Sequence, residues 1–333
     1  MLFPDSFEER TVSLGQVEDR EGLPPAKVFA LHHTGPANIS TANKKLLILL
    51  HGYPQNHTLY HLFVQELARL GALKEWDVVI PDLPGYGRSS KTPSADGSHT
   101  ANSKRTIATD IVSLINSLYD TQQKFVVVGH DRGARVAYRM AKDHRDRVLG
   151  TCLLEIVPTK IMFERMTFAD NHRLTFGTYH WIFLALPSPL PETLISASSD
   201  FYYRHTIESW TGPRYQGRYD SAAFTSWVEQ YRDPAVLTGA LEDYRAGATI
   251  DLEHDEEDER NGRAAVDCPL LVLHAVQFGQ RFDVKGIWEK LGVPGKVKVT
   301  SVGDEEVGHF IPIEAAQEVV TEIVPWLKSL SLP

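Results

Sequence analysis

The chain has 333 residues, of which 42% are hydrophobic and 23% are charged, and its formal net charge at pH 7 is −9. These values are typical of a globular protein and fit a single α/β unit that carries an insertion. They argue against nucleic-acid binding, which normally requires clustered Lys and Arg residues, and no apolar run approaches the roughly 20 residues that span a bilayer. We therefore expect a small-molecule substrate, no nucleic-acid partner and no membrane partner.

The N-terminus and the cysteine content predict a cytoplasmic protein. The opening residues, MLFPDSFEER, contain neither a charged segment followed by an apolar one nor an Arg-rich amphipathic pattern. The two cysteines, Cys152 and Cys268, each border an apolar run and are too few to form a metal cluster by themselves. We expect both to be buried and reduced, and we expect neither a metal nor a cofactor.

Short apolar runs alternate with helical patterns through much of the chain. A helical stripe is formed by Ile107, Ile111, Leu114, Ile115 and Leu118. Strands are predicted within residues 45–52, 76–87, 124–131, 148–159 and 268–275. This alternation predicts an α/β fold with a mostly parallel central sheet, in which reactive groups gather at the carboxyl ends of the strands.

The pattern changes to aromatic-rich and helical, without a convincing strand, over residues 158–245. We interpret this stretch as a helical cap domain inserted into a core made of residues 1–157 and 246–333. Residues 313–330 predict a closing helix. The acidic run DLEHDEEDER, at 251–260, contains one histidine, but blocks of like charge usually face water, so we expect a solvated helix or loop rather than a metal site.

The stretch VVVGHDRGARVAYRMA, at residues 126–141, places an aspartate at a corner between a strand and a helix. Three valines run into Gly129, and the apolar spacing after Gly133 suits a packed helix. A G-x-S-x-G sequence at such a corner exposes a nucleophile, and here Asp131 replaces the serine. Taken alone, the pattern is equally compatible with an aspartate that caps the following helix.

Residues later in the chain favour a nucleophile. His309 lies in VGHFIPIEAA, in a loop before the closing helix, where the base of such a nucleophile is expected. Two carboxylates could orient this histidine, and each follows a predicted strand: Glu155 and Asp283. The spacing of the sequence does not choose between them.

The turn HGYP, at residues 51–54, follows the apolar run LLILL. Its Tyr53 amide could form an oxyanion hole together with the amide of Arg132, which follows the nucleophile. An ordinary strand-to-helix turn is the alternative. The position of the turn upstream of the Asp131 corner favours the functional interpretation.

The sequence resembles the α/β-hydrolases that use an aspartate nucleophile and, among them, the haloacetate (fluoroacetate) dehalogenases. The resemblance covers nearly the whole chain and rests on HGYPQNHTLYH, DLPGYGRSS, SHTANSKRTIATDI, GHDRGARVAYRMA, LEIVPT, YHWIFLALPSPLPE, EDYRAGA and GHFIPIEA. HGYP and GHDRG are shared in outline with epoxide hydrolases and haloalkane dehalogenases. HDRGAR together with YHW and DYRAGA is much more specific.

The resemblance implies that Asp131 is the nucleophile, that His309 is the base, and that Arg132 and Arg135 bind the carboxylate of the substrate. It also implies a halide pocket made of His180, Trp181 and Tyr244. The chemistry agrees, because departing fluoride needs several converging donors, which imidazole, indole and phenol groups supply. Two arginines near a helix N-terminus form a local anion site despite the negative net charge.

The chain departs from the family pattern at three places. Glu155 stands where the resemblance predicts an aspartate, so the longer side chain would have to fold back to hold the histidine. Leu186 replaces a glutamine expected after YHW, and LHAVQFGQ differs from the tryptophan-containing run that is usual there. We therefore expect an intact nucleophile set and a pocket altered for a different substrate.

Two enzymatic functions fit these residues. The first is hydrolytic dehalogenation of a small 2-haloacid, in which Asp131 displaces halide from carbon and water activated by His309 cleaves the resulting ester. The second is epoxide hydrolysis by the same two residues, with Tyr244 and either Tyr179 or Tyr202 donating to the epoxide oxygen. A non-catalytic receptor on this fold would have lost the nucleophile or the base. A homodimer is compatible with the sequence.

Overall fold

The computed structural model describes residues 2–15, 25–35, 45–92, 94 and 96–330 of the chain. Within these residues eight strands form one sheet, in the order β1-β2-β4-β3-β5-β6-β7-β8. The strands are β1 (Phe7–Ser13), β2 (Lys27–His33), β3 (Lys45–Leu50), β4 (Trp76–Pro81), β5 (Phe125–His130), β6 (Val148–Leu154), β7 (Leu270–Ala275) and β8 (Val297–Val302). β2 pairs antiparallel with β1 and β4, and the other pairs are parallel, which confirms the predicted mostly parallel sheet.

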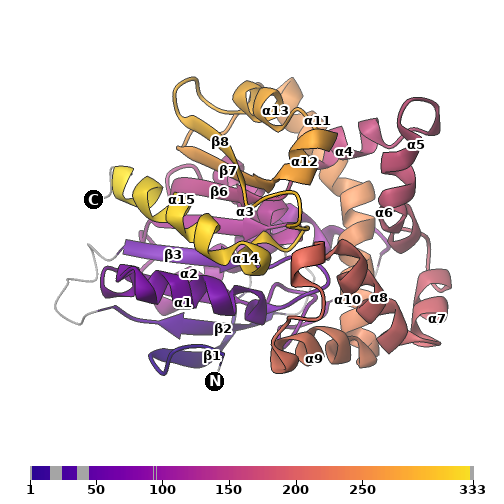
Figure 1. Cartoon of the computed structure of the whole chain (residues 1–333), viewed down its shortest axis with the longest axis horizontal. Coiled ribbons are helices and arrows are strands. Elements are labelled where there is room, and N and C mark those ends of the chain that lie inside the picture. The colour runs from indigo at the N-terminus through magenta and orange to yellow at the C-terminus, as the bar shows by residue number, and fades with distance from the viewer. Residues whose placement is uncertain (1, 16–24, 36–44, 93, 95, 331–333) are drawn as a thin grey trace.

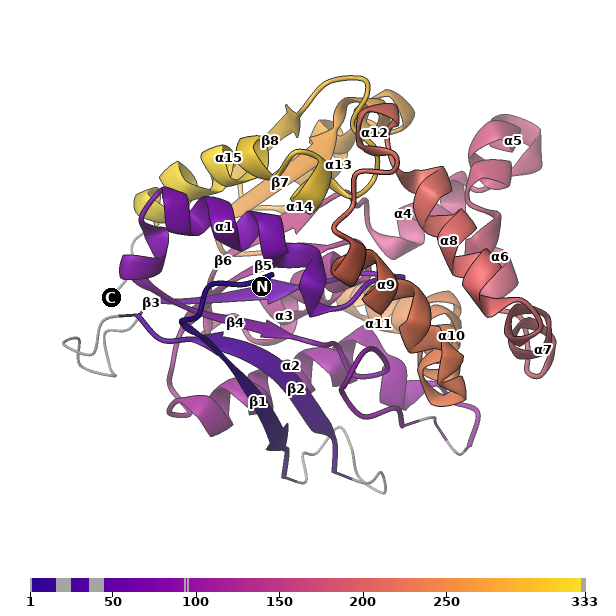
Figure 2. The ribbon, with the colours of Figure 1, turned by 60° about the horizontal axis from the view of Figure 1, so that its bottom comes forward.

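Helices cover both faces of the sheet. Figure 2 shows α1 and α15 above it and α2 and α3 below it. These helices and the others of the core are α1 (His61–Arg69), α2 (Lys104–Leu118), α3 (Arg132–Asp143), α11 (Ile250–Arg260), α12 (Val276–Arg281), α13 (Val284–Leu291), α14 (Ile311–Glu314) and α15 (Ala316–Ser329). The closing helix predicted over 313–330 is therefore two helices that are separated at Ala315.

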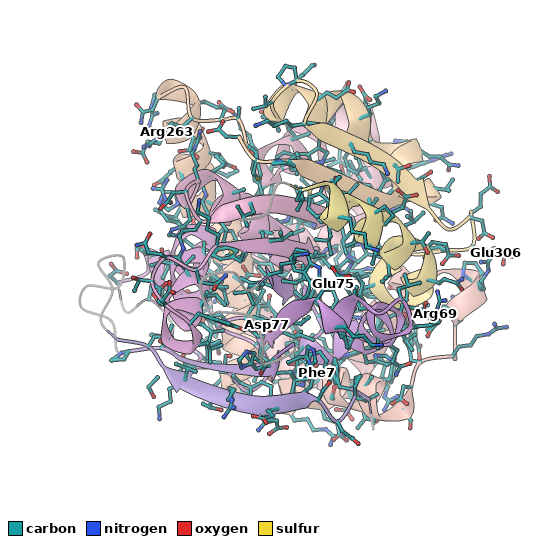
Figure 3. The ribbon with its side chains drawn as sticks, turned by 90° about the vertical axis from the view of Figure 1, so that its left-hand side faces the viewer. Phe7, Arg69, Glu75, Asp77, Arg263 and Glu306 are labelled. Carbon is teal, nitrogen blue, oxygen red and sulfur yellow. The ribbon has the colours of Figure 1, made fainter. Side chains whose placement is uncertain are left out.

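The central strands are buried because helices shield both faces. Every residue of β4 and of β5 is buried, and these strands consist largely of valine, isoleucine and other apolar residues, as expected for parallel strands covered on both sides. Figure 3 shows side chains filling the space between the sheet and its helices, while Arg263 and Glu306 lie at opposite margins of the molecule. The sheet is thus a rigid base for the groups at its strand ends.

The stretch predicted as a cap contains helices and no strand. Its helices are α4 (Thr159–Arg165), α5 (Phe168–Gly177), α6 (Tyr179–Leu184), α7 (Leu190–Ser196), α8 (Ser199–Trp210), α9 (Ser221–Glu229) and α10 (Pro234–Ala248). Figure 1 shows them gathered at one end of the sheet, on the right of the view. The last of these helices continues past residue 245, where the sequence placed the end of the cap. The predicted core ranges also include residues that lie outside the described part of the chain.

The acidic run 251–260 corrects one expectation. It is a helix, α11, but two of its carboxylates are buried rather than solvated. Asp258 Oδ2 accepts a hydrogen bond of 2.6 Å from Arg139 Nη1, and Asp251 Oδ2 lies 3.1 Å from Lys104 Nζ. These partners come from α3 and α2, so the charges hold helices together. No group of three or more His, Cys, Asp or Glu side chains among the described residues could hold a metal ion.

Two smaller predictions can also be compared with the structure. Cys152 and Cys268 are both free; Cys152 is buried as expected, whereas Cys268 is only partly buried. No helix in the described part of the chain is both long enough and apolar enough to cross a membrane.

Candidate active site

Asp131 stands at the corner between β5 and α3, as the sequence predicted. Its backbone has φ 50° and ψ −116°, a region that residues with a side chain rarely occupy, so the surrounding structure must hold it there. A Cβ atom at Gly129 would lie 2.4 Å from the main-chain oxygen of Gly133, and one at Gly52 would lie 2.5 Å from Asp131 Cβ. Glycine at these positions lets the chain approach closely enough to form the corner.

The two carboxylate oxygens of Asp131 have different surroundings. The amide of Tyr53 donates a 3.0 Å hydrogen bond to Oδ1, so the HGYP turn contributes the predicted donor. No such bond from the Arg132 amide is seen in the described structure. Oδ2 lies 3.7 Å from His309 Nε2. Burial opposes ionisation, yet the hydrogen bond and the charge of His309 keep the pKa of Asp131 well below its ordinary value.

His309 lies between two carboxylates. Its Nδ1 is 3.4 Å from Glu155 Oε2, and the other Glu155 oxygen accepts a hydrogen bond from the Ala275 amide at the end of β7. Glu155 is buried and has φ 59°, a left-handed backbone conformation that residues with a side chain rarely adopt. Burial alone would lower the pKa of His309, but Asp131 and Glu155 raise it to about 9.

Asp283, the other candidate for the acid, lies elsewhere. Its carboxylate caps the N-terminus of α13, where Oδ1 accepts a 3.0 Å hydrogen bond from the Gly286 amide, and the residue is exposed. The structure thus brings Glu155, and not Asp283, to the histidine.

The two arginines of the predicted carboxylate clamp are in different positions. Arg132 is only 1% exposed; its Nε donates to Asp243 Oδ2 at 2.7 Å and its Nη2 to the Asp243 main-chain oxygen at 2.5 Å. Lys104 contacts the same carboxylate. Burial disfavours the charge of Arg132, but Asp243 raises its pKa above the ordinary value. Arg132 is therefore held by the protein itself, and it is not among the residues that line the cavity over Asp131.

Arg135 does line that cavity. Its Nη1 donates to the main-chain oxygen of Val157 and to Thr159 Oγ1, both at 3.0 Å, while its buried Nε has no partner in the described structure. Burial and the neighbouring Arg132 charge lower the pKa of Arg135 to about 10, so it remains a cation at neutral pH. Arg135 thus places a positive charge on the wall of the cavity that contains Asp131.

A cavity of about 1120 Å³ opens above Asp131 and His309. Of the predicted halide pocket, His180 and Trp181 line the cavity, whereas Tyr244 lies behind them, with its ring centre 6.0 Å from that of His180. Burial lowers the pKa of His180 to about 3, so this imidazole is neutral. The Tyr53 ring is buried and meets the Tyr244 ring edge-on at 5.1 Å between centres.

Two further residues, neither of them predicted from the sequence, hold parts of the site in place. Asp243 holds Arg132, as described above. Glu314 accepts 2.8 Å hydrogen bonds from the amides of Gly212 and Gly308 on Oε2, and a 2.9 Å bond from the Phe310 amide on Oε1. It therefore joins the His309 loop to the cap. Asp243 lies in the motif EDYRAGA and Glu314 in the motif GHFIPIEA. Their presence in these motifs is the sequence feature from which a role at the site could have been predicted.

Known proteins resemble this chain in sequence and in fold. The α/β-hydrolase fold family matches residues 45–316. The fluoroacetate dehalogenase of Burkholderia sp. is 36% identical over 85% of this chain and 83% of its own, and the soluble epoxide hydrolase of Corynebacterium sp. (strain C12) is 26% identical over 82% and 87%. An α/β hydrolase structure from Nostoc sp. PCC 7120 is 35% identical, covering 99% of this chain and 100% of its own with a TM-score of 0.82. The chain therefore belongs to the α/β-hydrolase fold family, and it is a hydrolase related to the fluoroacetate dehalogenase of Burkholderia.

Proposed function

We propose that the protein is a hydrolytic dehalogenase of 2-haloacids that works through an ester on Asp131. The observation that carries this proposal is the row of Asp131, His309 and Glu155 at the base of a cavity that also contains the cation of Arg135. The nucleophile Asp131 follows β5, and the base His309 lies in the loop before α14. Arg135, whose charge would bind an acid substrate, belongs to α3. The similarity to a fluoroacetate dehalogenase supports dehalogenation as the reaction.

In the first step, Asp131 Oδ2 attacks the carbon that carries the halogen. A carbon–oxygen bond forms, the carbon–halogen bond breaks, and the halide leaves with the bonding electrons. Oδ1 becomes the ester carbonyl oxygen, already held by the Tyr53 amide. Arg135 binds the carboxylate of the substrate, and the N–H groups of His180 and Trp181 stabilise the departing halide.

In the second step, water cleaves the ester. His309 Nε2 takes a proton from the water molecule, whose oxygen bonds to the ester carbon of Asp131. The Tyr53 amide stabilises the negative charge that develops on Oδ1. The bond between the ester carbon and the alkoxy oxygen then breaks, and the departing alkoxy oxygen takes the remaining proton of the former water molecule. A 2-hydroxyacid leaves and the Asp131 carboxylate is restored, while Glu155 stabilises the imidazolium ring that holds the first proton.

The alternative of epoxide hydrolysis would need two phenol groups directed at the nucleophile. Tyr179 is 48% exposed, and neither Tyr202 nor Tyr244 is among the residues that line the cavity. Arg135, in contrast, places a positive charge on the cavity wall, which a neutral epoxide does not require. These observations favour the haloacid over the epoxide.

We also propose that the enzyme is located in the cytoplasm. Its proposed binding partner is a small-molecule substrate. Two free cysteines, Cys152 and Cys268, support this location, because reduced thiols persist in the cytosol.

Substitution of Arg135 with methionine tests the substrate class. We expect Arg135→Met to raise KM for chloroacetate by about tenfold or more, because the acid loses a charge-assisted hydrogen bond, and to leave any activity on styrene oxide nearly unchanged. The measurement is halide and diol release across a panel of haloacids and epoxides. Equal losses on both substrate classes, or faster wild-type turnover of epoxides than of every haloacid, would reassign the enzyme to epoxide hydrolysis.

Substitution of Glu155 tests its proposed role in orienting His309. We expect Glu155→Gln to slow ester hydrolysis by more than about a hundredfold, because the imidazolium loses its charged partner. The pKa of His309, followed by NMR, should fall in this variant, a change that a loss of packing alone would not require. Asp283→Asn is the matched control and should keep both the rate and the pKa of His309. The opposite ranking of the two variants would identify Asp283 as the acid.

A further inference from the structure

The cavity above Asp131 is much larger than a haloacetate requires. Haloacetates have five non-hydrogen atoms, whereas pockets of about 300–1,000 Å³ already enclose drug-sized ligands. The volume here is about 1120 Å³. The cavity therefore has room for more than the reacting part of the substrate, and its lining residues indicate what else the substrate could carry.

Part of the cavity wall is apolar and comes from both the core and the cap. Met162 of α4 and Leu174 of α5 line the cap side, and each is buried. Phe278 of α12 and Phe282 line the core side, packed against each other with 5.0 Å between their ring centres. Val157, which follows β6, is also buried and connects these walls to the region of Arg135. The cavity that contains Asp131 therefore also has an apolar section, to which both the core and the cap contribute.

Other residues of the cavity lining carry polar side chains. Arg173, Gln280, Arg281 and Glu305 line the cavity and are exposed to solvent. Charges in such a position are hydrated, so they do not compete with the apolar walls for the apolar part of a ligand.

We propose that the substrate is a 2-haloacid with an extended apolar substituent, such as a hexyl chain, on the carbon that Asp131 attacks. The substituent lies between Met162 and Leu174 on one side and Phe278 and Phe282 on the other. This inference rests on the proposed function, because the position of the substituent follows from Arg135 binding the acid. Each methylene group fully buried between such walls would improve binding about fourfold.

The test compares 2-bromooctanoate with 2-bromopropanoate, which react at the same type of secondary carbon and differ in the length of the apolar chain. We expect kcat/KM for 2-bromooctanoate to be larger by about tenfold or more. Bromide release from bromoacetate and 2-bromopropanoate without this preference would overturn the inference and leave the proposed function intact. Bromide release from none of the acids would reject the proposed function itself.

Variants of the two apolar walls test where the substituent of the acid binds. Leu174→Trp, which narrows the apolar section, and Phe278→Ala, which removes part of the opposite wall, should each lower the ratio of kcat/KM for the two acids by about tenfold. Phe176→Trp is the control on the same helix, because Phe176 is 66% exposed and lies outside the cavity. If Leu174→Trp does not fold, Phe278→Ala decides. An unchanged ratio in the folded wall variants would overturn the inference.

A dicarboxylic acid provides the last comparison. 2-Bromoadipate would place a second carboxylate near Arg173 and Arg281, at the solvent-exposed part of the cavity. We expect it to be a poorer substrate than 2-bromooctanoate. A preference for 2-bromoadipate would show that these arginines select the substrate, and it would overturn the apolar assignment.

Discussion

Asp131→Ala is expected to lower kcat for a haloacid by about 10⁴-fold or more, because the remaining groups can bind the acid but cannot displace its halide. Halide release by the purified variant measures this loss, and circular dichroism checks that the variant is folded. Asp283→Asn is the control, because Asp283 caps α13 at an exposed position and is not among the residues that line the cavity. Activity within tenfold of the wild type would exclude Asp131 as the nucleophile.

The path of the oxygen atom shows whether Asp131 attacks carbon or only activates water. In a single turnover in ¹⁸O-labelled water, the label should enter the Asp131 carboxylate, since water attacks the ester carbonyl and the alcohol keeps an oxygen of the protein. Mass spectrometry of the peptide that contains Asp131 detects the label. Label in the product alone would make Asp131 a general base and would remove the ester from the mechanism.

His309→Ala is expected to stop after releasing one halide per enzyme molecule, with Asp131 esterified. The first step does not need a base, whereas the second requires the proton of water to be removed. The trapped ester is measured in two ways: as a burst of halide, and as an Asp131 peptide whose mass is increased by the carboxyalkyl group of the substrate. His205→Ala provides a control at an exposed histidine of the cap. An unaltered steady-state rate for His309→Ala would exclude His309 from the mechanism.

The sequence predicted the parts of the fold in which local pattern and burial coincide. The valines of β5 run into glycine, and the helix after Asp131 begins at the next residue, so the corner could be located from spacing alone. The loop that contains His309 and the strands that helices cover on both faces could likewise be located from the sequence pattern. Three strands were not predicted: β1, β2 and β8. β1 exposes most of its residues and β8 lies at the other edge of the sheet, so neither has a continuous apolar run.

Contacts between distant residues account for what the sequence could not predict at the site. Arg132 was assigned to the substrate carboxylate, but its nearest anion is Asp243, 111 positions later in the chain. Asp258 was expected to face water, but it binds Arg139, 119 positions earlier. Because the partners in each pair are so far apart in the chain, neither ion pair leaves a repeating pattern of residues from which it could be predicted. The choice of Glu155 over Asp283 likewise depends on which strand end lies beside the histidine loop.

The charge on His309 has a consequence for the order of events. With a pKa of about 9, the imidazole of the resting enzyme holds a proton at neutral pH and cannot accept another from water. Esterification neutralises Asp131, which removes the leading cause of this high pKa, while burial continues to favour the neutral ring. In the proposed mechanism the pKa of His309 would therefore fall once the ester has formed, although Glu155 still favours the charged ring. We expect this fall to let His309 accept a proton from water only after the halide has left, so that the loss of one negative charge keeps the two half-reactions in sequence.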